Sequence, residues 1–96
     1  MQYAPLGRTE LNCSRIGLGT WAFASQAYGD VSEAEACEAV RIALDLGINL
    51  FDSAPLYGVG SGPDARDGVA EEVLGRALGA NRDRAVISTK FGRNPS

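Results

Sequence analysis

The chain has 96 residues, of which 45% are hydrophobic and 22% charged, and its formal net charge is −3. This length allows one small domain over residues 1–96, and the apolar share excludes a chain that is disordered by composition. The acidic balance argues against nucleic acid and against an anionic membrane surface as partners, since both attract basic proteins. No segment approaches the roughly 20 apolar residues of a membrane-spanning helix.

The counts of cysteine and histidine limit the chemistry further. Two cysteines are too few for a disulfide framework; we expect Cys37 in the core and consider Cys13 a candidate exposed thiol. With no histidine, this chain cannot form a histidine metal site or a histidine-dependent triad. The first residues lack the basic and apolar regions of a secretory signal, so we expect a reduced protein of the cytoplasm.

The first part of the chain predicts a hairpin, a strand and a helix. The hairpin covers residues 2–15, and a short buried strand follows over 15–21. Ser32 and Glu35 then form a capping box, in which each side chain satisfies a free backbone N–H at the start of a helix over 33–46. The apolar stripe of this helix consists of Ala36, Cys37, Val40, Ala43 and Leu44.

The second part of the chain alternates strand and helix. A strand over 48–52 ends in a carboxylate, and a long loop rich in Gly, Pro and Asp covers 55–68. A second helix over 69–78, closed by Gly79, has a single apolar stripe, and a third strand covers 84–90. This order predicts parallel strands in chain order, joined by right-handed crossovers, with both helices on one face of the sheet.

Three polar residues fall where a parallel sheet binds its ligands, beyond the carboxyl ends of the strands. Asp52 ends the second strand, Tyr57 lies in the following loop, and Lys90 ends the third strand. A cation beside Tyr57 lowers the pKa of the phenol, which makes it a usable proton donor at neutral pH. Singly, each residue has an ordinary structural role as a turn, packing or strand-end residue. At a separation of roughly 4 Å, Asp52 and Lys90 would attract each other by on the order of 4 kcal/mol before desolvation.

Four segments resemble, in the right order, the N-terminal part of the aldo/keto reductase family. They are Leu6-Gly7-Arg8-Thr9 with Ser14-Arg15-Ile16-Gly17-Leu18-Gly19-Thr20-Trp21, Gly47-Ile48-Asn49-Leu50-Phe51-Asp52-Ser53-Ala54 with Leu56-Tyr57-Gly58, Glu71-Glu72-Val73-Leu74-Gly75-Arg76-Ala77-Leu78, and Arg82-Asp83-Arg84-Ala85-Val86-Ile87-Ser88-Thr89-Lys90-Phe91-Gly92. They resemble the family's opening hairpin and first strand, the signature around its catalytic Asp and Tyr, the next helix, and the strand with its catalytic Lys. One such segment would be a weak signal, whereas four in order are a strong one.

The resemblance implies an α/β fold that is the N-terminal part of a TIM (α/β)8 barrel, a hairpin and then β-α-β-α-β with parallel strands, with the barrel not closed. It also implies reduction of a small-molecule carbonyl substrate with NADP(H), or with NAD, and without a metal. By resemblance Tyr57 is the general acid, Lys90 lowers the pKa of that phenol, and Asp52 pairs with Lys90. The residues that the resemblance places at the cofactor are Gly19, Thr20, Trp21 and Asp52.

The chain departs from the family's pattern in three respects. The loop over 58–68 is longer than the usual link, and Ala70 stands where a Ser or Thr cap is common, so we expect Asp67 or Gly68 to start the second helix. The family's catalytic histidine and the loops that hold most of the dinucleotide follow later than residue 96. We therefore expect a fragment, from a truncated reading frame or a partial sequence, that is inactive by itself.

A Rossmann-type dinucleotide fingerprint is spelled by Gly17, Gly19 and Ala22, but that motif opens directly into a helix, and here about ten loop residues intervene. The glycines within 58–62 lack the Gly-Lys-Ser/Thr of a P-loop. The alternative function is a non-catalytic αβ module for interaction or oligomerisation, which would pair through exposed strand edges. The sequence leaves open the substrate, the choice between NADP and NAD, and the oligomeric state.

Overall fold

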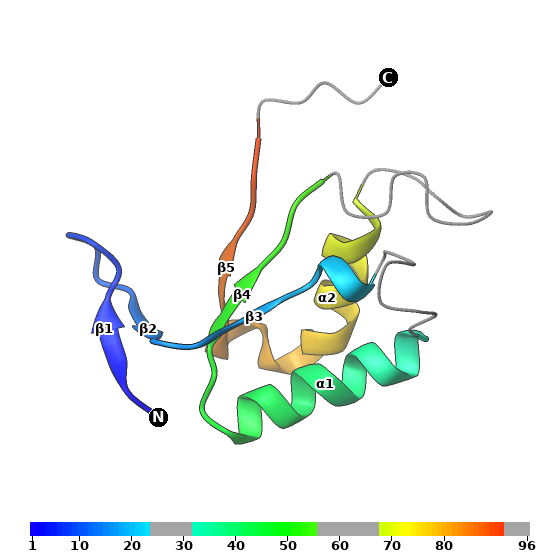
Figure 1. The fold of residues 1–96 in the computed structure, drawn as a ribbon, viewed down its shortest axis with the longest axis horizontal. Helices are drawn as coiled ribbons and strands as arrows, with labels where there is room; N and C mark the ends of the chain where they lie inside the picture. The colour runs from blue at the N-terminus through cyan, green and yellow to red at the C-terminus, as the bar shows by residue number, and fades with distance from the viewer. Residues whose placement is uncertain (24–31, 56–67, 92–96) are drawn as a thin grey trace.

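The computed structural model describes residues 1–23, 32–55 and 68–91. Within these ranges a two-stranded hairpin is followed by a β-α-β-α-β unit (Figure 1). In chain order the elements are β1 Tyr3–Pro5, β2 Asn12–Ser14, β3 Gly17–Gly19, the 3-10 helix η1 Trp21–Phe23, α1 Glu33–Asp45, β4 Leu50–Asp52, α2 Val69–Leu78, the 3-10 helix η2 Gly79–Arg84, and β5 Val86–Ser88.

The main sheet has three parallel strands in the order β3-β4-β5. Its register aligns Leu18 with Phe51 and Phe51 with Ile87, so these three side chains lie in one row on the same face. The predicted order of parallel neighbours is confirmed. The carboxyl ends of the three strands therefore meet at one edge of the sheet, which is the edge where ligands of such folds bind.

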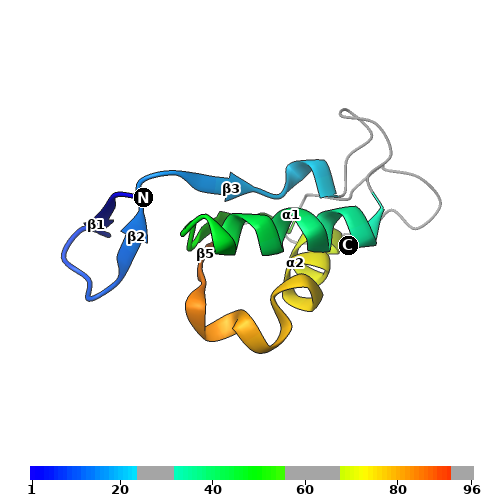
Figure 2. The same cartoon turned by 90° about the horizontal axis from the view of Figure 1, so that it is seen from below.

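Both helices pack on one face of this sheet (Figures 1 and 2). Phe51, at the centre of β4, is fully buried in one apolar cluster with Val40 of α1 and with Leu74 and Leu78 of α2. Because one apolar cluster joins β4 to residues of both helices, the helices share a face of the sheet, as the crossover rule predicts. A doubly wound sheet would have helices on both faces, so the prediction of an opened barrel wall is confirmed.

The strands are shorter than the sequence predicts. β5 begins at Val86 because the chain up to Arg84 forms η2, and the N–H of Ala85 donates to the Arg82 carbonyl. β3 ends at Gly19 because the chain then turns into η1. The residues that do pair, 17–19, 50–52 and 86–88, all lie within the predicted strands.

The helix starts agree with the sequence. Ser32 and Glu35 form the predicted capping box: the Ser32 hydroxyl accepts from the Glu35 N–H, and the Glu35 carboxylate accepts from the Ser32 N–H, each over 3.1 Å. Gly47, with φ of +93°, follows the end of α1. Gly68, with φ of +83°, is the N-cap of α2 and is one of the two predicted starts.

The hairpin is fixed to the connection between α1 and β4. The Ser14 N–H donates to Asn49 Oδ1 over 2.6 Å, and the Asn49 N–H donates to Ser14 Oγ over 3.0 Å. The Asn49 amide also donates to the Asn12 carbonyl, and the Tyr3 hydroxyl donates to the Gly47 carbonyl. These bonds hold the hairpin at the amino ends of the parallel strands, opposite the edge that carries the candidate site (Figure 1).

The two cysteines differ from expectation. Cys13 is only 5% exposed, so the interpretation as an exposed thiol is wrong; it is buried in β2 next to Ser14, whose N–H and hydroxyl bind Asn49 in the connection between α1 and β4. Cys37 is half-buried rather than part of the core, and both are free thiols. Nowhere in the three described ranges is a helix long and apolar enough to cross a membrane.

Candidate active site

Two of the three predicted catalytic side chains meet at the carboxyl edge of the sheet. Asp52 is the last residue of β4, and Lys90 lies just after β5. Lys90 Nζ lies 3.3 Å from Asp52 Oδ2 and 3.4 Å from Oδ1, and it donates to the Ser53 carbonyl over 2.9 Å. The neighbouring strands thus bring together charges that are 38 residues apart in the sequence.

This ion pair is open to solvent. The side chain of Lys90 is 52% exposed and that of Asp52 is 49% exposed. An exposed pair of this kind stabilises a fold by about 0–1 kcal/mol, so the expected attraction of about 4 kcal/mol is too large once water screens both groups. The exposed ion pair is accessible to a ligand and contributes little to the stability of the fold.

A buried pair of hydroxyls joins β3 to β4 directly beneath Asp52. The N–H and the hydroxyl of Thr20 both donate to the Asp52 carbonyl, over 2.9 and 3.0 Å, and the hydroxyl also lies 2.9 Å from Ser53 Oγ. Thr20 and Ser53 are fully buried. These contacts fix the backbone from which the Asp52 carboxylate projects, and they turn the Thr20 hydroxyl inward.

The cofactor residues that the resemblance implies lie beside the same edge. Gly19 is aligned with Asp52 in the sheet, and a Cβ atom at Gly19 would have no neighbour within 4 Å among the described residues. The next element, η1, begins at Trp21, a residue that is 46% exposed. Open space beside a glycine, a flat exposed ring and a carboxylate fit the nicotinamide end of a dinucleotide.

Tyr57, the third predicted catalytic residue, lies outside the described residues. The structure does describe the two ends of its segment. The Gly68 N–H donates to the Pro55 carbonyl over 2.7 Å. The last described residue after β4 and the N-cap of α2 are therefore hydrogen-bonded neighbours. Pro55, after which the segment with Tyr57 begins, lies three residues beyond Asp52.

Sequence reasoning missed two contacts of the site. The first is the Ser53 carbonyl, the shortest of the three contacts between Lys90 and the end of β4. The second is a hydrogen bond from the Thr89 hydroxyl to Glu71 Oε2 over 2.6 Å. A main-chain acceptor leaves no signal in a sequence. The second contact leaves a weak signal, because Thr89 directly precedes Lys90 and Glu71 lies in the first turn of the preceding helix.

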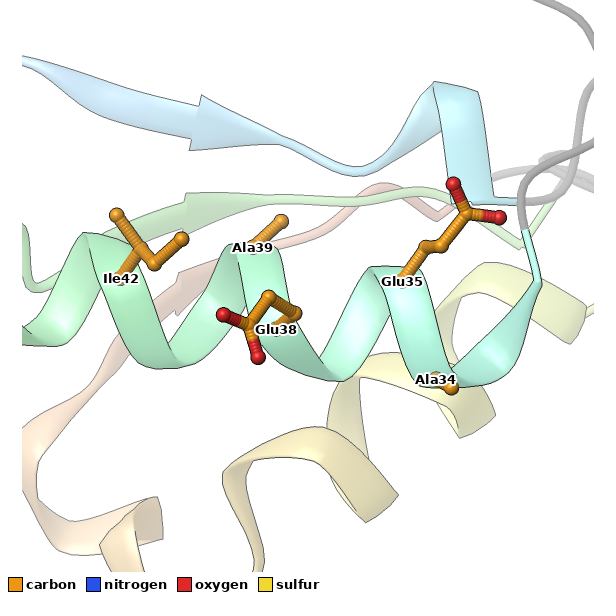
Figure 3. Close-up of a pocket in the computed structure, with 5 residues that line it drawn as sticks. All are labelled: Ala34, Glu35, Glu38, Ala39 and Ile42. Carbon is orange, nitrogen blue, oxygen red and sulfur yellow. The ribbon is translucent and has the colours of Figure 1, made fainter.

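The apolar hollow on α1 lies apart from this site. It has a volume of about 430 Å³ and is lined by Ala34, Glu35, Glu38, Ala39 and Ile42, all from one helix (Figure 3). None of the candidate catalytic residues lines it. In the described part of the chain, no three Cys, Asp or Glu residues gather where they could hold a metal ion.

The groups whose pKa values are shifted also lie on helix α1 or contact it. Hydrogen bonds from Ser32 lower the pKa of Glu35. A hydrogen bond with Glu33 raises the pKa of Arg76, which joins α2 to α1, and the charge of Glu72 raises it further. These groups stabilise the helices and take no part in the site.

Fold and site together define the first portion of a (β/α)8 barrel with polar residues at the carboxyl ends of its strands. Residues 15–96 match the model of the aldo/keto reductase family, and the chain belongs to that family.

Relatives are similar over nearly the whole chain. Aldo-keto reductase YhdN of Bacillus subtilis is 39% identical over 94% of this chain and 25% of its own length. Pyridoxal 4-dehydrogenase of Microbacterium luteolum is 44% identical over 92% of this chain and 23% of its own length. The solved structure of aldo-keto reductase AKR11C1 from Bacillus halodurans, in its holo form, has a TM-score of 0.76 at 29% identity and covers 96% of this chain and 26% of its own. The chain thus spans about a quarter of the length of these relatives.

Proposed function

We propose that residues 1–96 supply the N-terminal quarter of an oxidoreductase that reduces aldehydes or ketones to alcohols with NAD(P)H. One observation carries the proposal: the ammonium of Lys90 is held between the Asp52 carboxylate and the Ser53 carbonyl at the carboxyl edge of the sheet. Pro55, after which the segment with Tyr57 begins, follows shortly after these residues and is bound by the N–H of Gly68. Below, the full-length reductase means the protein to which this quarter would belong.

Reduction of a carbonyl needs a hydride at carbon and a proton at oxygen. NAD(P)H, when bound, would supply the hydride that adds to the carbonyl carbon, with the electron pair of the C=O bond moving to oxygen. In our proposal, the Tyr57 phenol donates its proton to that oxygen, which gives the alcohol. The positive charge of Lys90 stabilises the phenolate that remains, so it lowers the pKa of Tyr57. Asp52 keeps Lys90 at this edge.

The cofactor would lie with its nicotinamide beside Gly19 and Trp21. Gly19 leaves space at the backbone, Trp21 offers an exposed ring, and Asp52 is aligned with Gly19 in the sheet. Thr20 would contribute through its backbone position, since its hydroxyl is buried. NADP(H) is the cofactor we propose, with NAD as the alternative. Comparison of kcat/KM with NADPH and with NADH distinguishes them.

The test uses Tyr57→Phe, Lys90→Met and Asp52→Asn in the full-length reductase, with an aldehyde panel and NADPH consumption as the readout. We expect kcat to fall by about a hundredfold or more for Tyr57→Phe and Lys90→Met, since general acid catalysis contributes about 10²–10⁴-fold. Tyr3→Phe is the matched control, because the hydroxyl it removes binds Gly47 at the opposite end of the sheet. Unchanged turnover in Tyr57→Phe would overturn the assignment.

The alternative, a non-catalytic interaction module, is favoured by the open strand edges. Within the described residues, β3 and β5 each pair with β4 alone, and such edges can pair with another chain. A concentration-dependent dimer of residues 1–96 in light scattering, together with no activity in the full-length protein, would support it. We propose the cytoplasm as the location, since both cysteines are free thiols and suit a reducing compartment.

A further inference from the structure

We propose that Glu71 positions the Lys90 ammonium by holding its neighbour Thr89, an inference that rests on the proposed function. The Thr89 hydroxyl donates to Glu71 Oε2 over 2.6 Å, across 18 residues of sequence. Glu71 lies in the first turn of α2. This bond therefore ties the segment that carries Lys90 to a helix rather than to the sheet.

Lys90 lies beyond the paired part of β5. The last aligned pair is Asp52 with Ser88, and the Ser53 N–H donates to the Ser88 carbonyl over 2.8 Å. After this point the chain runs away from β4 (Figure 1). Strand pairing thus fixes Ser88 and leaves the direction of the next two residues to side-chain contacts.

Thr89 and Lys90 reach in different directions. Thr89 contacts α2, which packs on the helix-covered face, whereas Lys90 contacts Asp52 and Ser53 at the end of β4. Successive side chains of an extended chain point to opposite sides. Holding Thr89 against α2 therefore sets the side on which Lys90 projects, and rotation of this segment would take the ammonium away from Asp52.

Glu71 lies on a helix that is held in place by buried residues. Its neighbours Ala70, Val73 and Leu74 are buried in the contact with α1 and the sheet. The carboxylate lies near the helix N-terminus, where the helix dipole favours a negative charge. A residue on a packed helix holds its partner more closely than a residue on a loop does.

The N-terminal end of α2 also binds Pro55, the last described residue before the segment with Tyr57. Gly68, the N-cap of α2, donates to the Pro55 carbonyl over 2.7 Å. The Glu71–Thr89 bond and the Gly68–Pro55 bond therefore both start from the N-terminal end of α2. Loss of the Glu71 bond would shift Lys90 relative to this common support, and displacement of a catalytic group by about 1 Å can cost up to 10²-fold in rate.

The experiment removes the bond from each side in the full-length reductase. Thr89→Val deletes the hydroxyl at nearly constant shape, Thr89→Ser keeps a hydroxyl, and Glu71→Ala deletes the acceptor. Glu72→Ala is the matched control one residue along the same helix. We expect kcat to fall about tenfold in Thr89→Val and in Glu71→Ala with KM little changed, no further fall in the double variant, and near wild-type kcat in Thr89→Ser and in Glu72→Ala.

A structural measurement separates positioning from general destabilisation. In a crystal structure of the Thr89→Val enzyme, we expect the distance from Lys90 Nζ to the Asp52 carboxylate to exceed hydrogen-bond reach, against 3.3 Å here. Full kcat in Thr89→Val and Glu71→Ala, or an unmoved Lys90, would overturn this inference while Lys90→Met still abolishes turnover. Unchanged turnover in Lys90→Met would instead overturn the proposed function itself.

Discussion

The ammonium of Lys90 lies 3.3 Å from the carboxylate of Asp52, although the two residues are 38 positions apart in the sequence. The parallel pairing of β4 with β5 produces this proximity, because it aligns Asp52 with Ser88 and so places the two strand ends side by side. Since both groups are about half exposed, the pair contributes little to the fold and is open to a substrate.

A double-mutant cycle of Asp52→Asn and Lys90→Met is expected to give a coupling energy of at most about 1 kcal/mol in the free energy of unfolding. Water screens the pair, so the fold barely depends on it. Urea unfolding of the four proteins measures this term. A coupling of several kcal/mol would show that the pair is far more desolvated than its exposure indicates.

Phe51→Ala is expected to lower the free energy of unfolding by about 3–5 kcal/mol. Phe51 is fully buried among residues of both helices, so truncation leaves a cavity at the centre of the unit. Phe91→Ala is the matched control, since Phe91 is fully exposed, and it should change stability by no more than about 0.5 kcal/mol. Equal effects of the two substitutions would contradict the described core.

Asn49→Ala is expected to cost about 1–3 kcal/mol, because it leaves the Ser14 N–H without its acceptor and removes the bond to the Asn12 carbonyl. Asn81→Ala, which removes a contact with exposed Arg84, should cost much less. Limited proteolysis reports the location of the effect: the hairpin should become cleavable first in Asn49→Ala and not in Asn81→Ala.

The capping box predicts an acid-sensitive helix start. Bonds from Ser32 lower the pKa of Glu35 below its ordinary value of 4.5. A lowered carboxyl pKa stabilises the fold above the unfolded-state value, and this contribution is lost as the pH falls through the folded-state value. Glu35→Gln, which removes the titrating carboxyl, should therefore lower Tm at neutral pH and flatten the fall of Tm below about pH 4.5, whereas Ser32→Thr should keep the wild-type Tm and its acid dependence. Parallel acid profiles of all three proteins would exclude this link.

Residues 1–96 by themselves are expected to show no NADPH-dependent reduction of aldehydes. Their described part provides three parallel strands of the eight in such a barrel, and the sequence has no histidine, so little would orient hydride donor and carbonyl. Absorbance of NADPH with an aldehyde panel measures this. Turnover that disappears in Tyr57→Phe would show that the fragment is a working enzyme.

Several features could be predicted from the sequence because they depend on neighbours in the chain. The capping box of Ser32 and Glu35, the apolar stripes of α1 and α2, and the glycine at position 68 are local patterns of spacing and backbone conformation. The parallel order of the strands follows from alternation and from the handedness of crossovers. These rules also place Asp52 and Lys90 at the same edge.

The tertiary structure alone decided the contacts that depend on register and packing. The alignment of Asp52 with Ser88 and the packing of α2 on the sheet determine three contacts. They determine which backbone carbonyl faces Lys90, whether the Thr20 hydroxyl points inward, and which helix residue contacts Thr89. Cys13 is buried in the hairpin, which binds Asn49 in the connection between α1 and β4, and no pattern within the hairpin shows that contact. A sequence pattern reports periodicity along one element, whereas these contacts join elements whose relative positions are fixed only when the core packs.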